Sequence, residues 1–282
     1  MSYTDVTVEV KNGIGRITIN RPESLNSLRI ETYTDLRRAL IAMDDDPNVV
    51  VTVLQGKGRF FSSGADVRSS MPSNPDSAKD YEETIARFAS GPGATARALI
   101  DHSKLLVVLL NGPVVGWPAG VRFQFIASTA VAIANADLIY AAESAYVYAP
   151  FTALAVSAEG GASAAYVQRM GVGAASEALL LGRRFTAKEL VPLGFVNRTF
   201  PDATFVQETE RILADAVENL SPNSLKVTKQ LIRESLRPAA HLANAKELEV
   251  LTERALSGEP TIQFAKQTRL MAAKKPAAKS NL

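Results

Sequence analysis

Two stretches of the chain are apolar without alternation, at residues 49–54 (VVVTVL) and 105–110 (LLVVLL). Continuous runs of β-branched and aliphatic residues are typical of strands that are buried on both faces of a sheet. Near the N-terminus, residues 6–10 alternate valine with polar residues, and residues 16–20 alternate again after Asn12-Gly13. Asn-Gly is the preferred dipeptide of a two-residue β-hairpin turn. The chain therefore begins with a predicted hairpin that leads into a buried sheet.

Helical spacing of apolar residues follows these strands, and it is the dominant pattern after residue 200. Shorter strands are predicted at 137–141, 145–149 and 195–200, and helix breaks at Gly91-Pro92-Gly93 and Gly171-Val172-Gly173. Helices are expected at 30–43, 78–89, 94–102, from 157 towards 170, and at 174–181, 186–193, 203–219, 224–236, 240–256 and 261–273. This order predicts an α/β core over residues 1–200, a helical region over 201–273 and a basic, disordered tail over 274–282.

Two turns rich in small residues follow the two buried strands. They comprise residues 56–66 (GKGRFFSSGAD) and 111–120 (NGPVVGWPAG). Glycine and other small residues let a ligand approach backbone N–H groups closely. Asp66 and Pro118 are residue types that often begin a helix, so a plain strand-to-helix connection is the alternative interpretation of each turn.

Composition limits the chemistry that these turns support. The 282 residues carry a net charge of +2, no cysteine, and two distant histidines, His102 and His241. Disulfides, thiolate nucleophiles and Cys-ligated metals are excluded, and a His-based metal site or catalytic triad is not expected. The balanced charge argues against nucleic acid as a partner. The N-terminus lacks a signal-peptide core and residues 105–119 are interrupted before membrane-spanning length, which predicts a soluble intracellular protein without a membrane partner.

One acid, Glu159, stands out because its neighbours Ala155, Val156, Ala158 and Gly160 are apolar or small. A carboxylate that loses its hydration has a raised pKa, and this brings it into a useful range for proton transfer. Two backbone N–H donors aimed at one oxygen stabilise a carbonyl or thioester that becomes an enolate. A glutamate that merely stabilises the N-terminus of a helix is the alternative interpretation.

Taken in order, four segments resemble the motifs of the crotonase (enoyl-CoA hydratase/isomerase) superfamily. They are residues 21–28 (RPESLNSL), 58–66 (GRFFSSGAD), 111–116 (NGPVVG) and 159–161 (EGG). The likeness covers roughly residues 5 to 270. It implies an α/β fold built as a spiral of ββα turns, with a C-terminal helical region that packs subunits into homotrimers or hexamers.

The resemblance also implies an acyl-CoA substrate and no cofactor, because CoA is part of the substrate. The matching positions place the N–H groups of Ala65 and Trp117 on the thioester oxygen, and each such donor contributes about 2.7–4 kcal/mol to transition-state stabilisation. The further substrate-binding residues implied in this way are Leu28, Ser63, Gly64, Asp66, Val67 and Gly116.

Within the family, the positions of the acids distinguish the reactions. Hydratases carry one glutamate in the helix after the second oxyanion turn and another just after a proline. Here residues 117–120 contain no acid and Phe151 follows Pro150. Glu159 instead resembles the single base of the Δ3,Δ2-enoyl-CoA isomerases of fatty-acid β-oxidation, especially the fungal peroxisomal type. Hydration, another acyl-CoA reaction, or an inactive acyl-CoA-binding subunit are the alternatives.

Three features depart from the family pattern. Trp117 is bulky where a small or aliphatic residue is usual, and residues 121–132 lengthen the path to the next strand, either as an insertion or through a misread splice junction. The tail ends in Ser280-Asn281-Leu282, one residue from the Ser-Lys-Leu peroxisomal signal. The expected compartment is therefore the peroxisome, with cytoplasm or mitochondrion as the alternatives.

Overall fold

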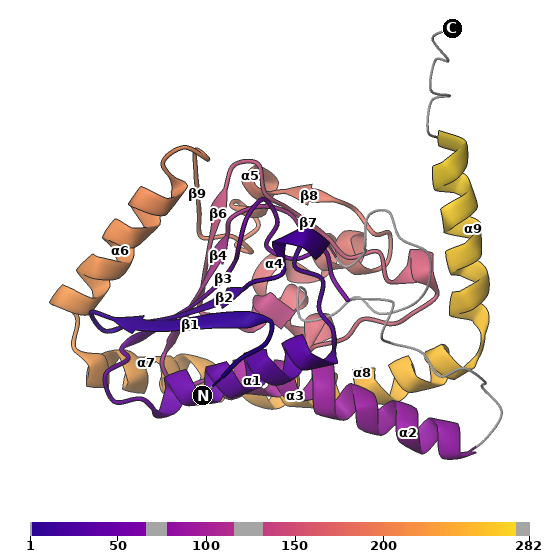
Figure 1. Ribbon diagram of the computed structural model, residues 1–282, viewed down its shortest axis with the longest axis horizontal. Helices are drawn as coiled ribbons and strands as arrows, with labels where there is room; N and C mark the ends of the chain where they lie inside the picture. Colours follow the sequence, from indigo (N-terminus) through magenta and orange to yellow (C-terminus); the bar gives the residue numbers. More distant parts are fainter. Residues whose placement is uncertain (1, 66–77, 116–131, 275–282) are drawn as a thin grey trace, which may run out of the picture.

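The computed structural model describes residues 2–65, 78–115 and 132–274. Within these residues, six strands form one sheet in the order β1-β2-β3-β4-β6-β9 (Figure 1). Its strands are β1 (Val6–Lys11), β2 (Ile14–Ile19), β3 (Val51–Gly56), β4 (Leu105–Leu110), β6 (Leu138–Ala142) and β9 (Arg198–Phe200). β1 and β2 pair antiparallel through the Asn12-Gly13 turn, and all later pairs are parallel. The predicted hairpin and buried strands are confirmed.

Side chains of β4 alternate between two apolar layers. Leu106 and Val108 belong to the main core, which also contains residues of the helices packed against β1, β2 and β3. Val107 and Leu109 face the opposite way, into a second cluster with Phe205. Both faces of the sheet are covered, so a strand in its centre needs no polar side. This is the physical reason for the uninterrupted apolar runs in the sequence.

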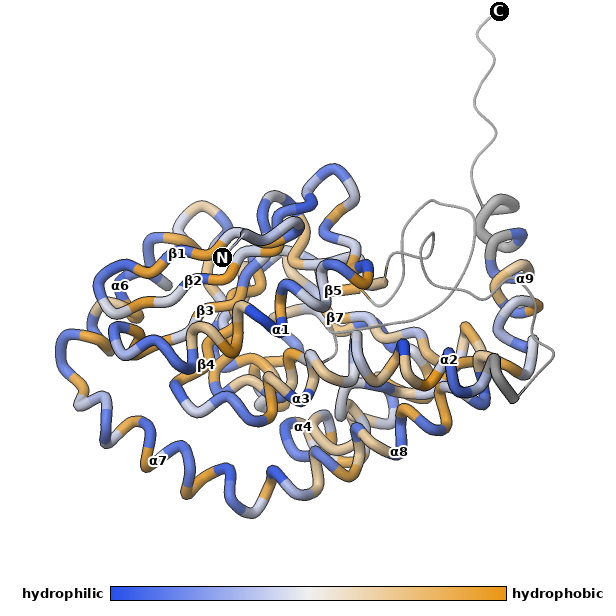
Figure 2. The backbone as a smooth tube through the Cα atoms, turned by 60° about the horizontal axis from the view of Figure 1, so that its bottom comes forward, coloured by the Kyte–Doolittle hydropathy of each residue, from blue (hydrophilic) through white to orange (hydrophobic). Residues whose placement is uncertain are grey.

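The helices agree with the predicted order, with shifts of a few residues at their ends. They are α1 (Ile30–Asp45), α2 (Ala78–Phe88), α3 (Ala94–Asp101), α4 (Ala162–Leu179), α5 (Ala187–Leu190), α6 (Phe205–Asn219), α7 (Pro222–Glu234), α8 (Arg237–Leu256) and α9 (Glu259–Lys274). Helix α7 alternates hydrophilic and hydrophobic residues along its length (Figure 2). The mixed α/β core with a helical C-terminal region is confirmed. None of the helices in the described part of the chain combines the length and the hydropathy that crossing a membrane requires.

Two predicted helix breaks have different outcomes. Gly171 has a φ of 73° inside α4 and interrupts its helical geometry, as expected. Residues Ala89–Gly93 instead form a π-helical turn that joins α2 to α3, so the chain stays coiled through Gly91-Pro92-Gly93. Helix α4 begins at Ala162 and not near residue 157, because Gly160 and Gly161 both have positive φ angles.

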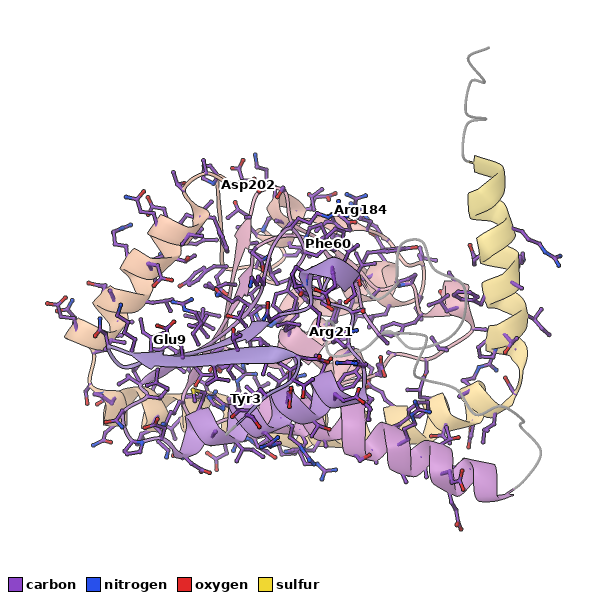
Figure 3. The ribbon with its side chains drawn as sticks, in the orientation of Figure 1. Tyr3, Glu9, Arg21, Phe60, Arg184 and Asp202 are labelled. Carbon is purple, nitrogen blue, oxygen red and sulfur yellow. The ribbon has the colours of Figure 1, made fainter. Side chains whose placement is uncertain are left out.

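A second sheet of three short strands was not predicted in full. It contains β5 (Val114–Val115), β7 (Tyr146–Tyr148) and β8 (Phe185–Thr186), of which the sequence indicated only β7. Strands of two residues are too short to show a period. The helix expected from residue 186 is limited to α5, with Thr186 as its cap. Arg184 next to this sheet stacks over the ring of Tyr146, 3.4 Å from its centroid (Figure 3).

The C-terminal helices join the core built by the earlier elements. α8 packs against α2, α3 and α4, and its Leu248 and Leu251 are buried in the main core. α9 packs against α8 and projects at the edge of the molecule (Figure 1). Helix α4, which α8 contacts, begins at Ala162, three residues after Glu159.

Candidate active site

The first predicted turn begins where β3 ends, at Gly56. A Cβ at this position would lie 2.4 Å from the carbonyl oxygen of Phe61, so the chain returns past Gly56 at a distance that only glycine permits. Gly64 has a φ of 89°, a conformation that favours glycine. The turn thereby brings Ser62, Ser63 and Ala65 into the buried interior.

The segment at residues 21–28 supports this turn from one side. The buried Asn26 side chain donates to the carbonyl oxygens of Lys57 (2.9 Å) and Phe60 (2.8 Å), and it accepts from the Arg21 N–H (3.0 Å). In return, the Ser62 hydroxyl donates to the Asn26 carbonyl at 2.9 Å. The sequence indicated this segment only as a family motif; the structure gives Asn26 the role of holding the turn.

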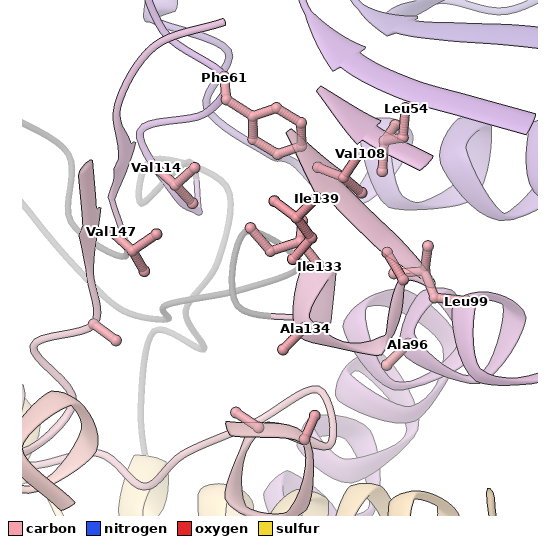
Figure 4. Packing of buried hydrophobic residues seen from close by; sticks show 14 of the residues in the cluster. Leu54, Phe61, Ala96, Leu99, Val108, Val114, Ile133, Ala134, Ile139 and Val147 are labelled. Atoms are coloured by element: carbon pink, nitrogen blue, oxygen red, sulfur yellow. The ribbon is translucent and has the colours of Figure 1, made fainter. Parts of the chain in front are cut away.

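The second predicted turn lies directly against the first. The side-chain oxygen of Asn111 accepts from the Gly56 N–H (3.0 Å), and its amide donates to the Gly58 carbonyl (2.7 Å). A Cβ on Gly112 would lie 2.1 Å from the carbonyl oxygen of Arg59. Phe61 of the first turn and Val114 after the second belong to the same apolar cluster as Leu54, Val108 and Ile139 (Figure 4).

The N–H of Ala65 is the donor that the resemblance implied for an oxyanion. Ala65 is 3% exposed and forms a parallel β-bridge with Leu28, in which the Leu28 N–H donates to the Gly64 carbonyl at 2.8 Å. No hydrogen bond within the described residues uses the Ala65 N–H. Buried N–H groups are rarely left unpaired in proteins, so the acceptor of this one is either a residue outside the described ranges or a ligand oxygen.

The predicted binding residues thus fall into two groups. Leu28, Ser63, Gly64 and Ala65 lie together in the supported first turn. Ser63 is held there by a bond from its N–H to the Leu25 carbonyl (2.9 Å). The other predicted positions, Asp66, Val67, Gly116 and Trp117, lie outside the described residues, as do residues 121–131 and the tail signal. Their roles stay predictions.

Glu159 is 1% exposed, and neither of its carboxylate oxygens has a hydrogen-bond partner among the described residues. Burial raises its pKa well above the usual range, and the negative charge of Glu247 raises it further. The hydroxyl of Ser157, two residues earlier, is also buried and has no hydrogen-bond partner in the described part of the chain. A helix-stabilising glutamate would accept backbone N–H groups, so the geometry favours a carboxyl group kept available for chemistry.

Other elements hold the turn that carries Glu159. The Asn135 amide donates to the Gly160 carbonyl (3.0 Å), while the Glu247 carboxylate accepts from the N–H groups of Gly161 (2.7 Å) and Ser163 (2.8 Å). Sequence reasoning missed both Asn135 and Glu247, because nothing in their local sequence distinguishes them from ordinary loop and helix residues. The role of Glu247 appears only where α8 meets α4, and that of Asn135 only where residues 132–135 meet the turn before α4.

Phe151 is buried in the main core, 1% exposed, and therefore provides an apolar side chain after Pro150. In the described part of the chain, His, Asp and Glu residues form no group of three that could hold a metal ion. Among the described residues, the site therefore offers the buried carboxyl group of Glu159 and, in the first turn, the N–H of Ala65.

The chain matches the model of the enoyl-CoA hydratase/isomerase family over residues 9–259. A dienoyl-CoA isomerase of Pyricularia oryzae, named Delta(3,5)-Delta(2,4)-dienoyl-CoA isomerase, is 35% identical, with 92% of this chain and 95% of the relative covered. A mouse protein named Enoyl-CoA delta isomerase 3, peroxisomal, is 31% identical over 98% of this chain and 80% of its own length. The expectation of an isomerase agrees with these names.

Among solved structures, an enoyl-CoA hydratase/isomerase from Pseudoalteromonas atlantica superposes with a TM-score of 0.78 at 26% identity. The superposition covers 98% of this chain and 100% of that one. The predicted crotonase fold is confirmed by this likeness together with the sheet and helices described above. The chain belongs to the enoyl-CoA hydratase/isomerase family.

Proposed function

We propose that this protein is a Δ3,Δ2-enoyl-CoA isomerase, which moves the double bond of an acyl-CoA from C3 to C2 in fatty-acid β-oxidation. The observation that carries the proposal is the buried carboxyl group of Glu159, whose oxygens have no partner among the described residues. The family of this chain is described as enoyl-CoA hydratase/isomerase, and two of its relatives are named as enoyl-CoA or dienoyl-CoA isomerases.

The reaction needs one group that first accepts and later donates a proton. Glu159 takes a proton from C2 of a 3-enoyl-CoA, the C2–H electrons form a C1–C2 double bond, and the thioester oxygen becomes negative. The N–H groups of Ala65 and Trp117 hold this oxygen in the dienolate intermediate. Glu159 then returns the proton to C4, and the double bond settles between C2 and C3. Atoms and charge balance, and no water or cofactor is consumed.

The raised pKa of Glu159 suits the first step, because a carboxylate of higher proton affinity is a stronger base. Hydration would require a second acid to activate water, and the family position for that acid is the buried, apolar Phe151. This comparison supports isomerisation over hydration. It also argues against an inactive binding subunit, which would have no need for a desolvated, unpartnered carboxyl group.

A second candidate is the conversion of a 3,5-dienoyl-CoA into a 2,4-dienoyl-CoA. The observation that favours it is the 35% identity to a relative of that name over 92% of this chain. The first half of the reaction is the same proton removal at C2, but the proton returns to C6 of a longer conjugated system. We rank it second because C6 is farther than C4 from C2, where the proton is removed. A second acid near C6 would deliver the proton more easily than Glu159.

The test is a substrate panel with one purified sample. The proposal predicts turnover of 3-enoyl-CoA to 2-enoyl-CoA, little hydration of 2-enoyl-CoA, and slower conversion of 3,5-dienoyl-CoA. Faster dienoyl conversion would favour the second candidate. Tight acyl-CoA binding without turnover of any substrate would favour an inactive binding subunit.

We further propose a peroxisomal location and a homotrimer or hexamer as the assembly. Support for the location comes from the mouse relative's name and from the Ser280-Asn281-Leu282 tail. Support for the assembly is the set of exposed apolar side chains on α7, at Val227, Leu231 and Ile232. Import of a fluorescent fusion with and without the last three residues tests the first proposal. Light scattering after size-exclusion chromatography tests the second.

A further inference from the structure

The turn that carries Glu159 leaves the start of α4 without a local cap. Gly160 and Gly161 have φ angles of 71° and 77°, and Gly161 occupies the N-cap position of α4. Glycine has no side chain that could accept the first N–H groups of the helix. Helix N-termini need such acceptors, and a buried terminus without them is destabilised.

Glu247 of α8 supplies this cap from outside the segment. One carboxylate oxygen accepts from the Gly161 N–H and the other from the Ser163 N–H, at 2.7 and 2.8 Å. The side-chain amide of Asn135 donates a hydrogen bond to the Gly160 carbonyl oxygen at 3.0 Å. The two residues directly after Glu159 are therefore fixed by side chains from two distant segments.

Glu247 is itself buried, at 7% exposure, and forms no ion pair within the described residues. Burial raises its pKa, while the N–H groups of Gly161, Ala162 and Ser163 oppose this by stabilising its charged form. Glu159 has no such donors. The backbone N–H donors therefore stabilise the charged form of Glu247, and its negative charge raises the pKa of Glu159.

Other ionisable groups on the packed helices are engaged elsewhere. Tyr166 on α4 is buried and its pKa is raised, so it is neutral. Arg169 on α4 donates to the carbonyl oxygens of Ala134 and Phe195. His241 on α8 pairs with Asp101 at 2.7 Å. Among the described residues, Glu247 is the charged group that acts on Glu159.

We propose that Glu247 is a positioning residue for the Glu159 base, because it fixes the turn at the start of α4. Its negative charge also raises the pKa of Glu159. The inference rests on the proposed role of Glu159. It assigns to α8, in the C-terminal helical region, a direct influence on the chemistry of the core.

The experiment compares Glu247→Gln, Glu247→Asp and Glu247→Ala with the control Glu249→Gln, which changes an exposed glutamate of the same helix. With the charge removed in Glu247→Gln, we expect the acid limb of the pH profile of kcat/KM to move to lower pH. In Glu247→Asp, which keeps the negative charge, the acid limb should lie at higher pH than in Glu247→Gln. In Glu249→Gln the pH profile should be the same as in the parent protein. For Glu247→Ala we expect kcat to fall by about 100-fold, with little change in KM, because the base is misplaced.

A second readout does not depend on activity. The carboxyl carbon of Glu159 is titrated by NMR in protein labelled with ¹³C at glutamate side chains, and the signal is assigned by its loss in Glu159→Gln. We expect its titration to move to lower pH in folded Glu247→Gln. An unchanged titration would overturn the inference whatever the enzyme activity. A shifted titration in a protein without isomerase turnover would contradict only the proposed function.

Discussion

The side-chain oxygen of Asn111 lies 3.0 Å from the backbone nitrogen of Gly56, and this contact joins the ends of two neighbouring strands. The same side chain donates to the Gly58 carbonyl at 2.7 Å. β3 ends at Gly56 and β4 ends at Leu110. Asn111, the residue directly after β4, therefore fixes the start of the first turn. The proposed oxyanion donor, Ala65, lies at the end of that turn.

Asn111→Ala should therefore separate the two turns. We expect kcat to fall by about 100-fold, since a displacement near 1 Å in a catalytic donor has an effect of this size. The free energy of unfolding should fall by only about 1–2 kcal/mol, which is typical of lost hydrogen bonds. Steady-state kinetics and urea unfolding measure the two effects. Asn48→Ala is the control, because the Asn48 side chain bonds only to Asp46 at the surface; equal kinetic losses in both variants would contradict the assignment.

Gly112→Ala tests the close approach of the turns in another way. Its Cβ would lie 2.1 Å from the Arg59 carbonyl oxygen, so the backbone must shift, and we expect a loss of stability of about 1–3 kcal/mol together with lower activity. A Cβ added at Gly173 would meet no atom within 4 Å. Gly173→Ala should therefore leave activity unchanged and stabilise the helix by about 0.5–1 kcal/mol. Thermal unfolding and activity assays of both variants test this prediction. Equal stability and equal activity of Gly112→Ala and Gly173→Ala would contradict the packing argument.

The fold was largely predictable because its central strands are buried on both faces and therefore read as unbroken apolar runs. The first turn and Glu159 were also singled out from the sequence, by small residues in one case and apolar neighbours in the other, whereas Ala65 as the donor in that turn was implied only by the family resemblance. The residues that support them were not. Asn26, Asn135 and Glu247 act through contacts with segments far away in the sequence, and no local pattern reports such contacts.

His102 makes stability depend on pH. Burial, together with the nearby charge of Lys229, lowers its pKa from 6.5 to about 4. The unfolded chain therefore takes up a proton before the folded protein does, and stability is lost as pH falls from 6.5 to 4. The contribution is up to about 3 kcal/mol at the acid end of this window. Urea unfolding at several pH values measures it. In His102→Gln the slope over this window should become shallower, and an unchanged slope would contradict the assignment.

Asp137, directly before β6, forms two partly buried ion pairs with α7. Its carboxylate lies 2.7 Å from Lys229 Nζ and 2.9 Å from a terminal guanidinium nitrogen of Arg233. Asp137→Asn leaves the buried Lys229 and the partly buried Arg233 without this negative partner, so we expect the free energy of unfolding to fall by about 2–3 kcal/mol, less than for a fully buried pair. Glu208→Gln, which breaks the exposed pair with Arg211, should leave the midpoint of denaturant unfolding unchanged. If Asp137→Asn lowers the free energy of unfolding only slightly, α7 is held mainly by apolar packing and the prediction is contradicted.

The most direct test of the central claim is the isomerisation rate of Glu159→Gln with a 3-enoyl-CoA substrate. Glutamine keeps the shape of the side chain but cannot accept the C2 proton, so kcat should fall by about 100- to 10,000-fold while acyl-CoA binding and the melting temperature stay close to those of the parent protein. In the parent protein, activity should be lost as pH falls through the raised pKa of Glu159, because protonation removes the base. A Glu159→Gln variant that isomerises 3-enoyl-CoA at the parent rate would contradict the proposed mechanism.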